Sequence, residues 1–433
     1  MAATERIFDT STPAVVLKLA PNVMHHGGLG AIRSLGRVGV PVYAVHERMR
    51  APAATSRYLA GRFIWNPDAS DLDQVTAGLL FMSERIGRPA VLFATDDVGS
   101  LYLAEHGSEL RSRFLFPDPP VGLPRRLADK HSLYEVCREM GLSAPQVCLP
   151  DSISEARMFA LSTGYPVIAK LTSPWLSGGR VPTTSLLRDE EGLADLYREC
   201  KQFNVRLMLQ EFIPGGSGHD WFFHGYCDAF SICRPAFTGI KVRSLPLGAG
   251  GTTFGRSAAN DKLREQVTEL LTRLKYRGLL DLDIRLDARD GQYNLLDFNP
   301  RVGAQFRIFR DTAGIDVILA AYLDLTGQAI PAGEQLQDRT FMAESYDPLS
   351  VLAHLRRGEL TPGRWLSEIR SLDEPAWFAR DDLRPFGLMC ARMAWKTASR
   401  SLPGIRRESS SGSSHETRIQ YRVGRAKLAR GRS

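Results

Sequence analysis

The chain has few cysteines, and none stands at a spacing typical of a metal site. Its 433 residues include six cysteines, with no Cys-x-x-Cys arrangement, and these stand among apolar neighbours as reduced, buried thiols do. No apolar run reaches the roughly eighteen residues that a membrane-spanning helix needs, and the first twelve residues lack the basic and apolar regions of a signal peptide. We therefore expect a cytoplasmic protein without a zinc cluster, a signal peptide or a transmembrane helix.

The main body of the chain also has little net charge. The net charge is +7, but residues 406–433 contain eight Lys and Arg against two Glu and so contribute +6 of it. A nearly neutral body does not indicate a nucleic-acid-binding protein, and no nucleic-acid partner is expected. The Ser-rich and Arg-rich tail lacks the apolar residues needed to fold, so we predict a disordered basic tail. Contact between this tail and an anionic surface is the alternative.

A dinucleotide-binding Gly-x-Gly-x-x-Gly motif is absent. Gly27, Gly28 and Gly30 form a glycine-rich turn after a predicted strand, but their spacing is different. Strands and helices alternate over residues 1–123, which predicts an N-terminal parallel α/β domain. Asp96 ends another of these strands, where it either contacts a substrate or caps the next helix.

Residues 278–310 carry the clearest chemical pattern. Apolar and charged residues alternate in a first strand, and a turn and a second strand follow. We predict an antiparallel hairpin in which Asp283 lies opposite Asp297, with Cβ atoms about 4.5 to 5.5 Å apart. Leu295 and Asn299 are expected on the same side of the second strand as Asp297.

Two carboxylates facing each other at this distance repel unless a positive group lies between them. Mg²⁺ binds one or two carboxylates and completes its shell with water and nucleotide phosphates, and Asn299 offers an amide oxygen beside Asp283 and Asp297. The hairpin therefore predicts a metal site at these three residues. A surface hairpin with solvated acids is the simpler interpretation.

This hairpin resembles the metal-binding hairpin of the ATP-grasp superfamily, in which an upstream acid and a downstream [DE]-x-N-x-R segment bind Mg²⁺ and the ATP phosphates. Asp283, Asp297, Asn299 and Arg301 match this pattern. The family usually has Glu where this chain has Asp297. The resemblance implies ATP and Mg²⁺ as cofactors, with Mn²⁺ as an alternative, and a catalytic role for Arg301 on the phosphates.

Two lysines match further parts of the same family. Lys130 follows Asp129 at the start of an amphipathic helix, where family members have a lysine that reaches the phosphates. Lys170 ends an apolar strand and precedes a glycine-containing loop at residues 173–184, as in the family's lysine strand and phosphate-covering loop. The resemblance implies that both lysines bind nucleotide.

A third segment indicates an adenine site. Gln210, Glu211, Phe212 and Ile213 end an apolar strand and resemble the family's Q-E-[YF]-I-x-G linker, so we expect them to bind the nucleotide. Asp220 follows the next turn and is predicted to accept hydrogen bonds from ribose hydroxyls.

A basic strand then precedes a second glycine cluster at residues 248–251. Preorganised positive charge beside a flexible loop can hold an anionic acceptor, and we predict a catalytic role for Arg243 in this strand. Lysine strand, loop, linker, basic strand, helix and acidic hairpin follow one another in the ATP-grasp order over residues 125–328.

These predictions combine into one organisation, which is α/β and α+β: an ATP-grasp fold with an N-terminal parallel α/β pre-ATP-grasp domain. We predict the pre-ATP-grasp domain at residues 1–123 and the ATP-grasp domain at 124–340, with a small lid subdomain about 145–215 and a core about 216–340. A helical extension at 341–405 and the tail at 406–433 follow.

The resemblance implies an ATP-dependent carboxylate–amine ligase acting through an acyl phosphate, most similar to the branch that contains D-aspartate ligase. The partners would be small-molecule carboxylate and amine substrates, such as amino acids, and a homodimer is allowed. A phosphotransferase and a non-catalytic nucleotide-binding regulator remain the alternatives.

Overall fold

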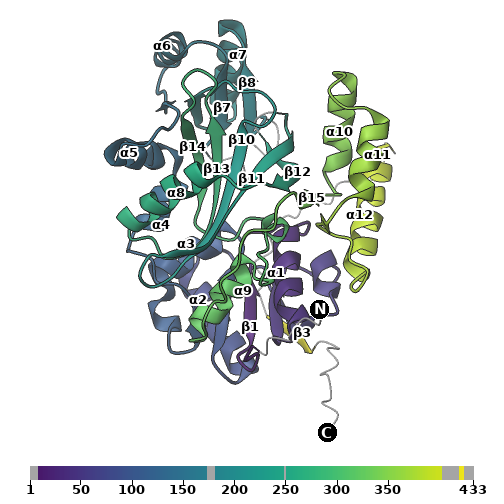
Figure 1. Ribbon diagram of the computed structural model, residues 1–433. Helices are drawn as coiled ribbons and strands as arrows, with labels where there is room; N and C mark the ends of the chain where they lie inside the picture. Colours follow the sequence, from purple (N-terminus) through teal and green to yellow (C-terminus); the bar gives the residue numbers. More distant parts are fainter. Residues whose placement is uncertain (1–7, 173–180, 248–249, 402–418, 424–433) are drawn as a thin grey trace.

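The computed structural model describes residues 8–172, 181–247, 250–401 and 419–423, arranged as three β-sheets with helices against them (Figure 1). A mostly parallel sheet forms the lower part of the view, a large antiparallel sheet the middle, and a small antiparallel sheet the top. Three C-terminal helices form a separate layer beside the large sheet.

The first sheet belongs to the N-terminal part of the chain. Its strands in spatial order are β17 (Gln420–Val423), β3 (Leu59–Ile64), β2 (Val42–His46), β1 (Ala14–Leu17), β4 (Ala90–Ala94) and β5 (Phe114–Leu115). All pairs except β17·β3 are parallel, which confirms the predicted parallel α/β sheet. The helical elements between and after these strands are α1 (His26–Arg37), η1 (Pro52–Thr55), α2 (Leu72–Ile86), α3 (Asp97–His106), η2 (Gly107–Leu110), α4 (Leu123–Ala128) and α5 (Lys130–Met140).

The prediction of a wholly disordered tail is wrong for β17. Gln420–Val423 pair antiparallel with Ile64 to Gly61 at the edge of the first sheet. The ring centres of Tyr421 and Phe63 lie 5.0 Å apart, and Tyr421 packs on the hydrophobic core of the first sheet. The residues around Tyr421 are mostly polar, so the composition of the tail did not indicate this apolar contact. Residues 402–418 and 424–433 lie outside the described part of the chain.

The small antiparallel sheet corresponds to the predicted lid. In spatial order it contains β6 (Val147–Cys148), β9 (Leu207–Glu211), β7 (Val167–Leu171) and β8 (Thr184–Leu187), and its helices are α6 (Ile153–Thr163) and α7 (Glu190–Gln202). Alternate residues of β7 and β9 pack with the two helices into a core of their own, while the other face of the sheet looks toward the large sheet.

The large sheet is the scaffold for the candidate site. Its spatial order is β14 (Tyr293–Asn299), β13 (Gly278–Leu286), β10 (Asp220–Cys227), β11 (Cys233–Leu245), β12 (Gly251–Ser257), β15 (Thr340–Met342) and β16 (Glu374–Pro375). Helix α8 (Asp261–Arg273) covers one face with Leu263, Val267 and Leu270, as its apolar spacing predicts. The short helix η4 (Phe306–Ile308) follows the hairpin.

One helix joins the first sheet to the large sheet. Seven of the nine residues of α9 (Val317–Leu325) are buried, because the helix lies between α1 and β10 and is covered on nearly every side. Its Asp316 cap accepts hydrogen bonds from the backbone N–H groups of Ile318 and Leu319. A single hydrophobic core therefore spans the two sheets and fixes one relative to the other.

The C-terminal layer consists of α10 (Asp347–Arg356), α11 (Pro362–Arg370) and α12 (Arg384–Ser401) (Figure 1). It is tied to the first sheet by Arg33, which is 2% exposed and donates to Asp382 and to the Trp377 carbonyl at 3.1 and 2.8 Å. Among the described residues, no helix is both long and apolar enough to cross a bilayer.

Candidate active site

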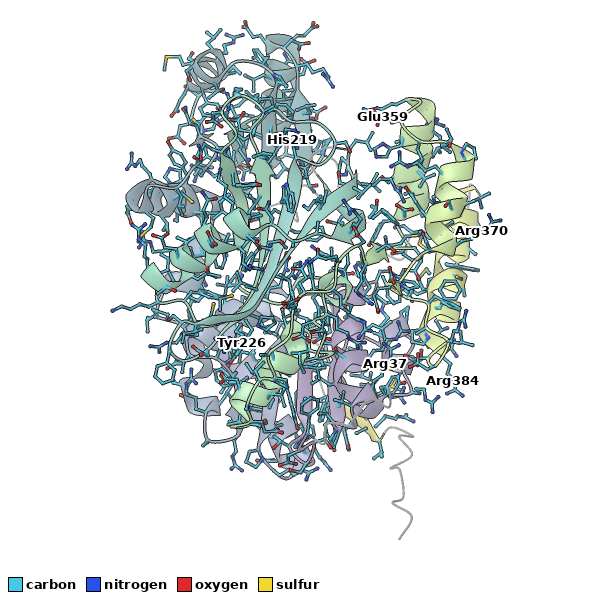
Figure 2. All side chains as sticks on the ribbon, viewed as in Figure 1. Arg37, His219, Tyr226, Glu359, Arg370 and Arg384 are labelled. Carbon is cyan, nitrogen blue, oxygen red and sulfur yellow. The ribbon has the colours of Figure 1, made fainter. Side chains whose placement is uncertain are left out.

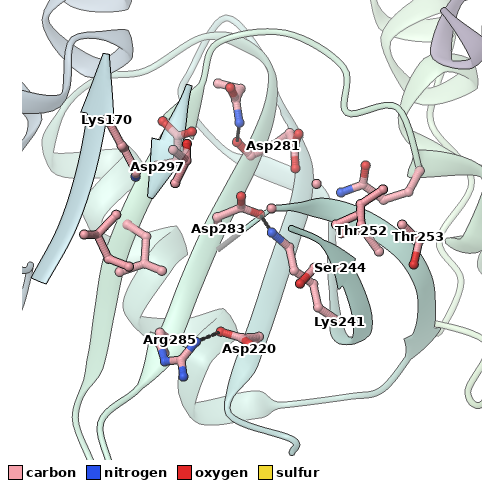
Figure 3. A pocket seen from close by; sticks show the side chains of 18 of the residues that line it. Lys170, Asp220, Lys241, Ser244, Thr252, Thr253, Asp281, Asp283, Arg285 and Asp297 are labelled. Atoms are coloured by element: carbon pink, nitrogen blue, oxygen red, sulfur yellow. Dashed lines mark hydrogen bonds and ion pairs between the residues drawn. The ribbon is translucent and has the colours of Figure 1, made fainter. Parts of the chain in front are cut away.

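The candidate site is a cleft of about 560 Å³ between the small sheet and the large sheet. Figure 3 shows charged side chains from both sheets converging on it. Of the twelve residues predicted from the sequence, eleven line the cleft: Lys130, Lys170, Gln210, Glu211, Phe212, Ile213, Asp220, Asp283, Asp297, Asn299 and Arg301. A cleft of this size is ordinary for a small-molecule ligand.

The hairpin β13–β14 has the register that its sequence predicts. Asp283 is paired with Asp297, and Asp281 with Asn299. A bulge between Asp283 and Ile284 inserts one extra residue into β14, so Leu295 is buried in the core and Leu296 lines the cleft. The prediction that Leu295 shares the side of Asp297 was therefore wrong, while the acidic pair is confirmed.

Each of the two opposed carboxylates has an ammonium group as its partner. The Lys130 Nζ lies 2.7 Å from Asp297, and the Lys241 Nζ lies 2.7 Å from Asp283. Burial lowers the pKa of Lys130, but the nearby Asp297 carboxylate raises it by more, so the net pKa lies above the ordinary value. The pKa of Lys241 is raised above its ordinary value in the same way, by Asp283. Burial raises the pKa of Asp297, but Lys130 and Lys170 bring the net value below the ordinary one. Lys130, Lys241 and Asp297 are thus charged at neutral pH.

Arg301 organises the end of the hairpin. Its guanidinium donates to Asp281 at 2.9 Å, to the Asn299 Oδ1 at 3.1 Å and to Asp97 at 3.1 Å. Asp281 is 5% exposed, and burial together with the neighbouring Asp283 raises its pKa to about 7 despite Arg301. The arginine is consequently held in place by three acceptors from two domains before any ligand binds.

Lys170 enters the cleft from the small sheet. Its ammonium donates to the Gln210 Oε1 at 2.8 Å, across the pair β7·β9. Burial and the neighbouring Lys130 lower the pKa of Lys170 to about 8. An anion bound beside these two lysines would relieve both effects, which is what a phosphate site requires.

The linker after β9 forms an apolar and polar wall. Phe212 and Ile213 line the cleft together with Ile168 and Leu296, an apolar lining of the kind that a planar base could pack against. Arg285 lies 5.2 Å from the centre of the Phe212 ring and donates to Asp220 at 2.7 Å. Burial raises the pKa of Asp220. The predicted ribose acceptor is therefore at the cleft wall, paired with an arginine.

Arg243 is the predicted residue that the structure does not bring to the cleft. It is 4% exposed, donates to both oxygens of Asp347 at 3.0 Å, pairs with Glu368 at 2.5 Å and lies over the Phe254 ring at 4.3 Å. These contacts hold α10 and α11 against β11. The bulge near residue 243 turns its side chain from the cleft, and Lys241 is the basic group that β11 supplies there.

The predicted phosphate-covering loop and the second glycine cluster are only partly described. Residues 173–180 and 248–249 lie outside the described residues. Gly250, Gly251, Thr252 and Thr253 do line the cleft, and the hydroxyls of the two threonines are buried with no hydrogen-bond partner in the described structure.

Of the two alternatives for Asp96, substrate contact and helix capping, the structure shows helix capping. The Asp96 carboxylate accepts hydrogen bonds from the N–H groups of Leu19, Ala20 and Gly99, so it caps α3 and a neighbouring loop. Gly27, Gly28 and Gly30, predicted as a turn, lie in the first turns of α1. From the first residue of this helix, His26 reaches the cleft, and burial lowers its pKa to about 4. The imidazole is neutral at pH 7.

Sequence reasoning missed three charged residues of the cleft: Lys241, Asp281 and Arg285. Asp281 and Arg285 lie on the same face of β13 as Asp283, and strict alternation was the available signal. Lys241 stands two residues before Arg243 in the same basic strand, and the bulge that separates them could not be read from the sequence.

The donor set suits Mg²⁺ bound together with phosphate. Among residues that the structure describes, no three His, Cys, Asp or Glu side chains form a metal cluster by themselves. Asp283, Asp297 and the Asn299 amide oxygen are hard oxygen donors at one end of the cleft, and Mg²⁺ commonly takes one or two carboxylates with the remainder from water and phosphates. Mn²⁺ accepts the same donors.

Part of the chain is similar in sequence to a known ligase and a known synthase. No protein-family model matches the chain. The D-aspartate ligase of Enterococcus faecium is 27% identical over 227 residues, 49% of this chain and 53% of the ligase. The carbamoyl phosphate synthase large chain of Vibrio cholerae is 22% identical over 218 residues, 47% of this chain and 19% of the synthase. The match to the ligase thus spans about half the length of that relative.

Solved structures cover more of the chain. An N5-carboxyaminoimidazole ribonucleotide synthetase in complex with ADP superposes with a TM-score of 0.57 at 11% identity, covering 82% of this chain and 87% of that chain. The biotin carboxylase domain of Hydrogenobacter thermophilus 2-oxoglutarate carboxylase, in complex with MgADP and bicarbonate, gives 0.53 at 16% identity, covering 75% and 71%. With a mostly parallel N-terminal sheet, two largely antiparallel sheets and an acidic hairpin in the predicted register, the chain has the ATP-grasp fold.

Proposed function

We propose that the protein is an ATP-dependent ligase that joins a carboxylate to an amine through an acyl phosphate and releases ADP and phosphate. The observation that carries this proposal is the charge arrangement of the cleft. Asp283 and Asp297 face each other, and Lys130, Lys170, Lys241 and Arg301 surround them. This pattern suits an anionic group that arrives with a divalent cation and is transferred within the cleft.

The four cations have separable tasks. Lys130 and Lys170 come from α5 and β7 and would hold the phosphates of ATP from the side of the small sheet. Lys241 and Arg301 approach from the large sheet and would stabilise the charge on the transferring phosphoryl group. Because Arg301 is already fixed by Asp281, Asn299 and Asp97, little reorganisation is needed at the moment of reaction.

Asp283, Asp297 and Asn299 would hold Mg²⁺, which supplies charge neutralisation of the phosphates when it is bound. The lysines that pair with these carboxylates in the present structure would then exchange their carboxylate partners for phosphate oxygens. Total charge stays balanced, since each ammonium leaves one anion for another.

The reaction itself is a double displacement. A substrate carboxylate oxygen attacks the γ-phosphorus, the bond to the β-phosphate oxygen breaks, and ADP leaves. The amine nitrogen then attacks the carbonyl carbon of the acyl phosphate, the carbon–oxygen bond breaks, phosphate leaves with that electron pair, and the amine proton passes to solvent. The cleft favours the first step by positioning and electrostatics rather than by a protein nucleophile.

The substrate class is an amino acid or a peptide-like compound. The sequence likeness to a D-aspartate ligase supports it, although that likeness covers half of each chain. The end of the cleft near β12 also supports it, because neutral His26 and the unpartnered hydroxyls of Thr252 and Thr253 offer hydrogen bonds without a fixed net charge.

Hydroxylamine trapping tests the proposal. Each amino acid of a panel that includes both enantiomers of aspartate is incubated with the protein, MgATP and hydroxylamine. We expect a hydroxamate with one acid, formed together with ADP and phosphate. A stable phosphorylated product without hydroxamate would establish a phosphotransferase, and no ADP release with any acid or amine would establish a nucleotide-binding regulator; either result refutes the ligase.

A further inference from the structure

The C-terminal layer exposes an unusual number of large apolar side chains. Half of the sixteen exposed large hydrophobic residues in the described structure fall between residues 346 and 395. Helix α11 has no buried residue at all, although its sequence contains Trp365, Leu366 and Ile369. A helix with apolar residues that are not covered by the protein itself is a common mark of an interaction surface.

The exposed apolar residues occupy one face of each helix. In α10, Asp347, Ser350 and Val351 face the body, whereas Leu349 and Leu352, which are 56% and 44% exposed, lie on the opposite side. In α11, Glu368 is turned inward by Arg243, and Leu366 and Ile369 are 47% and 39% exposed. Trp395 of α12 is 69% exposed.

The charges of the layer are divided between the same two sides. Most of its acids face the body and pair with arginines there: Asp347 and Glu368 with Arg243, Glu374 with Arg307, Asp381 with Arg37, and Asp382 with Arg33. Two acids are exposed, Glu359 beside His354 and Asp373 beside Thr340. Most acidic residues of the layer are thus paired with arginines of the body and do not lie on its outer side.

The exposed charge that remains is mainly arginine. Arg356, Arg370, Arg380 and Arg384 are exposed, whereas the exposed Arg357 lines a cavity between the layer and the large sheet. Figure 2 shows Arg370 and Arg384 at the outer edge of the layer, pointing away from the body. Arg356 follows Leu349 and Leu352 by seven and four positions, and Arg370 follows Leu366 by four, so arginine and aliphatic side chains share one face of α10 and of α11.

We propose that this outer face of α10, α11 and α12 binds the surface of an anionic lipid bilayer. Aliphatic and Trp side chains enter the boundary between headgroups and acyl chains, while guanidinium groups contact lipid phosphates. Charge complementarity favours an anionic membrane over a second copy of the chain, because two arginine-rich faces in contact would repel each other. The proposal is independent of the reaction assigned to the cleft.

The experiment measures co-sedimentation of the full chain with vesicles. Vesicles of phosphatidylcholine alone are compared with vesicles that also contain phosphatidylglycerol. We expect binding to the anionic vesicles, a loss of binding in high salt, and a blue shift of tryptophan fluorescence that disappears in Trp395→Phe. Equal binding to both vesicle types, or no binding to either, would overturn the proposal.

Two pairs of variants identify the face. Arg356→Gln with Arg370→Gln should weaken binding about 25-fold, from roughly fivefold for each arginine near an anionic surface. Leu366→Gln with Ile369→Gln should also weaken it. The control pair Met158→Gln with Leu161→Gln removes apolar residues of α6 that are even more exposed, at 66% and 76%, and should leave binding unchanged.

The remaining outcomes are also decisive. All variants change exposed side chains, and unchanged circular dichroism together with unchanged ATP binding shows that each has folded. Binding that survives both helix pairs would place the interaction elsewhere and overturn the proposal. Concentration-dependent dimerisation that Leu366→Gln with Ile369→Gln abolishes would assign the face to a second copy. Tight binding to polyglutamate without the Trp395 fluorescence shift would assign it to an acidic protein.

Discussion

Replacing Asp297 by Asn tests the acidic hairpin most directly. The amide keeps the volume of the carboxylate and can still accept a hydrogen bond, but it removes one of the two charges that face each other across β13 and β14. The Lys130 ammonium, 2.7 Å away, loses its partner. Both side chains are more than a quarter exposed, so solvent and nearby Asp283 limit the loss of stability to about 1 kcal/mol.

Activity should suffer far more than stability. Removing one group that stabilises the transferring phosphoryl group typically lowers turnover about 10²-fold or more, or roughly 2.7 kcal/mol of transition-state stabilisation. A loss of about 1 kcal/mol corresponds to a fall of only a few degrees in Tm. The fold-decrease in turnover is therefore expected to exceed the fold-decrease in the folding equilibrium constant by more than a factor of ten.

The assay combines thermal unfolding with steady-state ADP release in the presence of saturating MgATP. Asp290→Asn is the matched control, since Asp290 is exposed in the turn of the same hairpin and serves only the backbone N–H of Gln292. We expect the control to match the parent in both measurements. An Asp297→Asn protein with a clearly lower Tm and full activity would show that Asp297 is structural and that the hairpin is not the phosphoryl-transfer site.

Three further predictions concern the cations. Lys170→Ala should weaken ATP binding in calorimetry more than Lys130→Ala, because Lys170 projects from the strand that forms the wall of the cleft; equal affinities of Lys170→Ala and the parent would remove this lysine from the site. ATP affinity should fall as pH rises above about 8, where the Lys170 ammonium loses its proton, and a Lys170→Arg protein, charged at every such pH, should not show this fall. Arg243→Met should lower the free energy of unfolding by about 3 to 5 kcal/mol, because buried Asp347 is left without its partner, with part of this loss recovered by Arg243→Met with Asp347→Asn; a soluble, fully stable Arg243→Met protein would contradict the structural role.

The main parts of the fold could be predicted because their patterns are local. Alternation of apolar and charged residues in β13 fixed its two faces, and the short turn after it fixed the pairing of Asp283 with Asp297. The order of the strands along the chain then matched a known plan. A domain built from consecutive hairpins and strand–helix units leaves few alternatives for such a prediction.

The errors arose where one residue changes the phase of a strand. The bulge opposite Asp283 turns Leu295 into the core and Leu296 toward the cleft, and the bulges of β11 turn Arg243 away while Lys241 faces the site. The alternation of apolar and polar residues cannot locate such an extra residue, because the residue types before and after a bulge are the same as in a regular strand. The pairing of Gln420–Val423 with β3 was missed for another reason, since its partner lies more than 350 residues away.

The arrangement of Lys130 and Lys241 explains how two opposed carboxylates can exist in a protein without a ligand. Each carboxylate is held at 2.7 Å from an ammonium, so the repulsion between Asp283 and Asp297 is offset before any cation arrives. The same ammonium groups line the cleft and are available to an incoming phosphate. A cleft that keeps its own counter-ions in this way suits the proposed binding of a nucleotide with Mg²⁺, because Asp283 and Asp297 would pass to the metal and Lys130 and Lys241 would pass to the phosphates without leaving a charge unpaired.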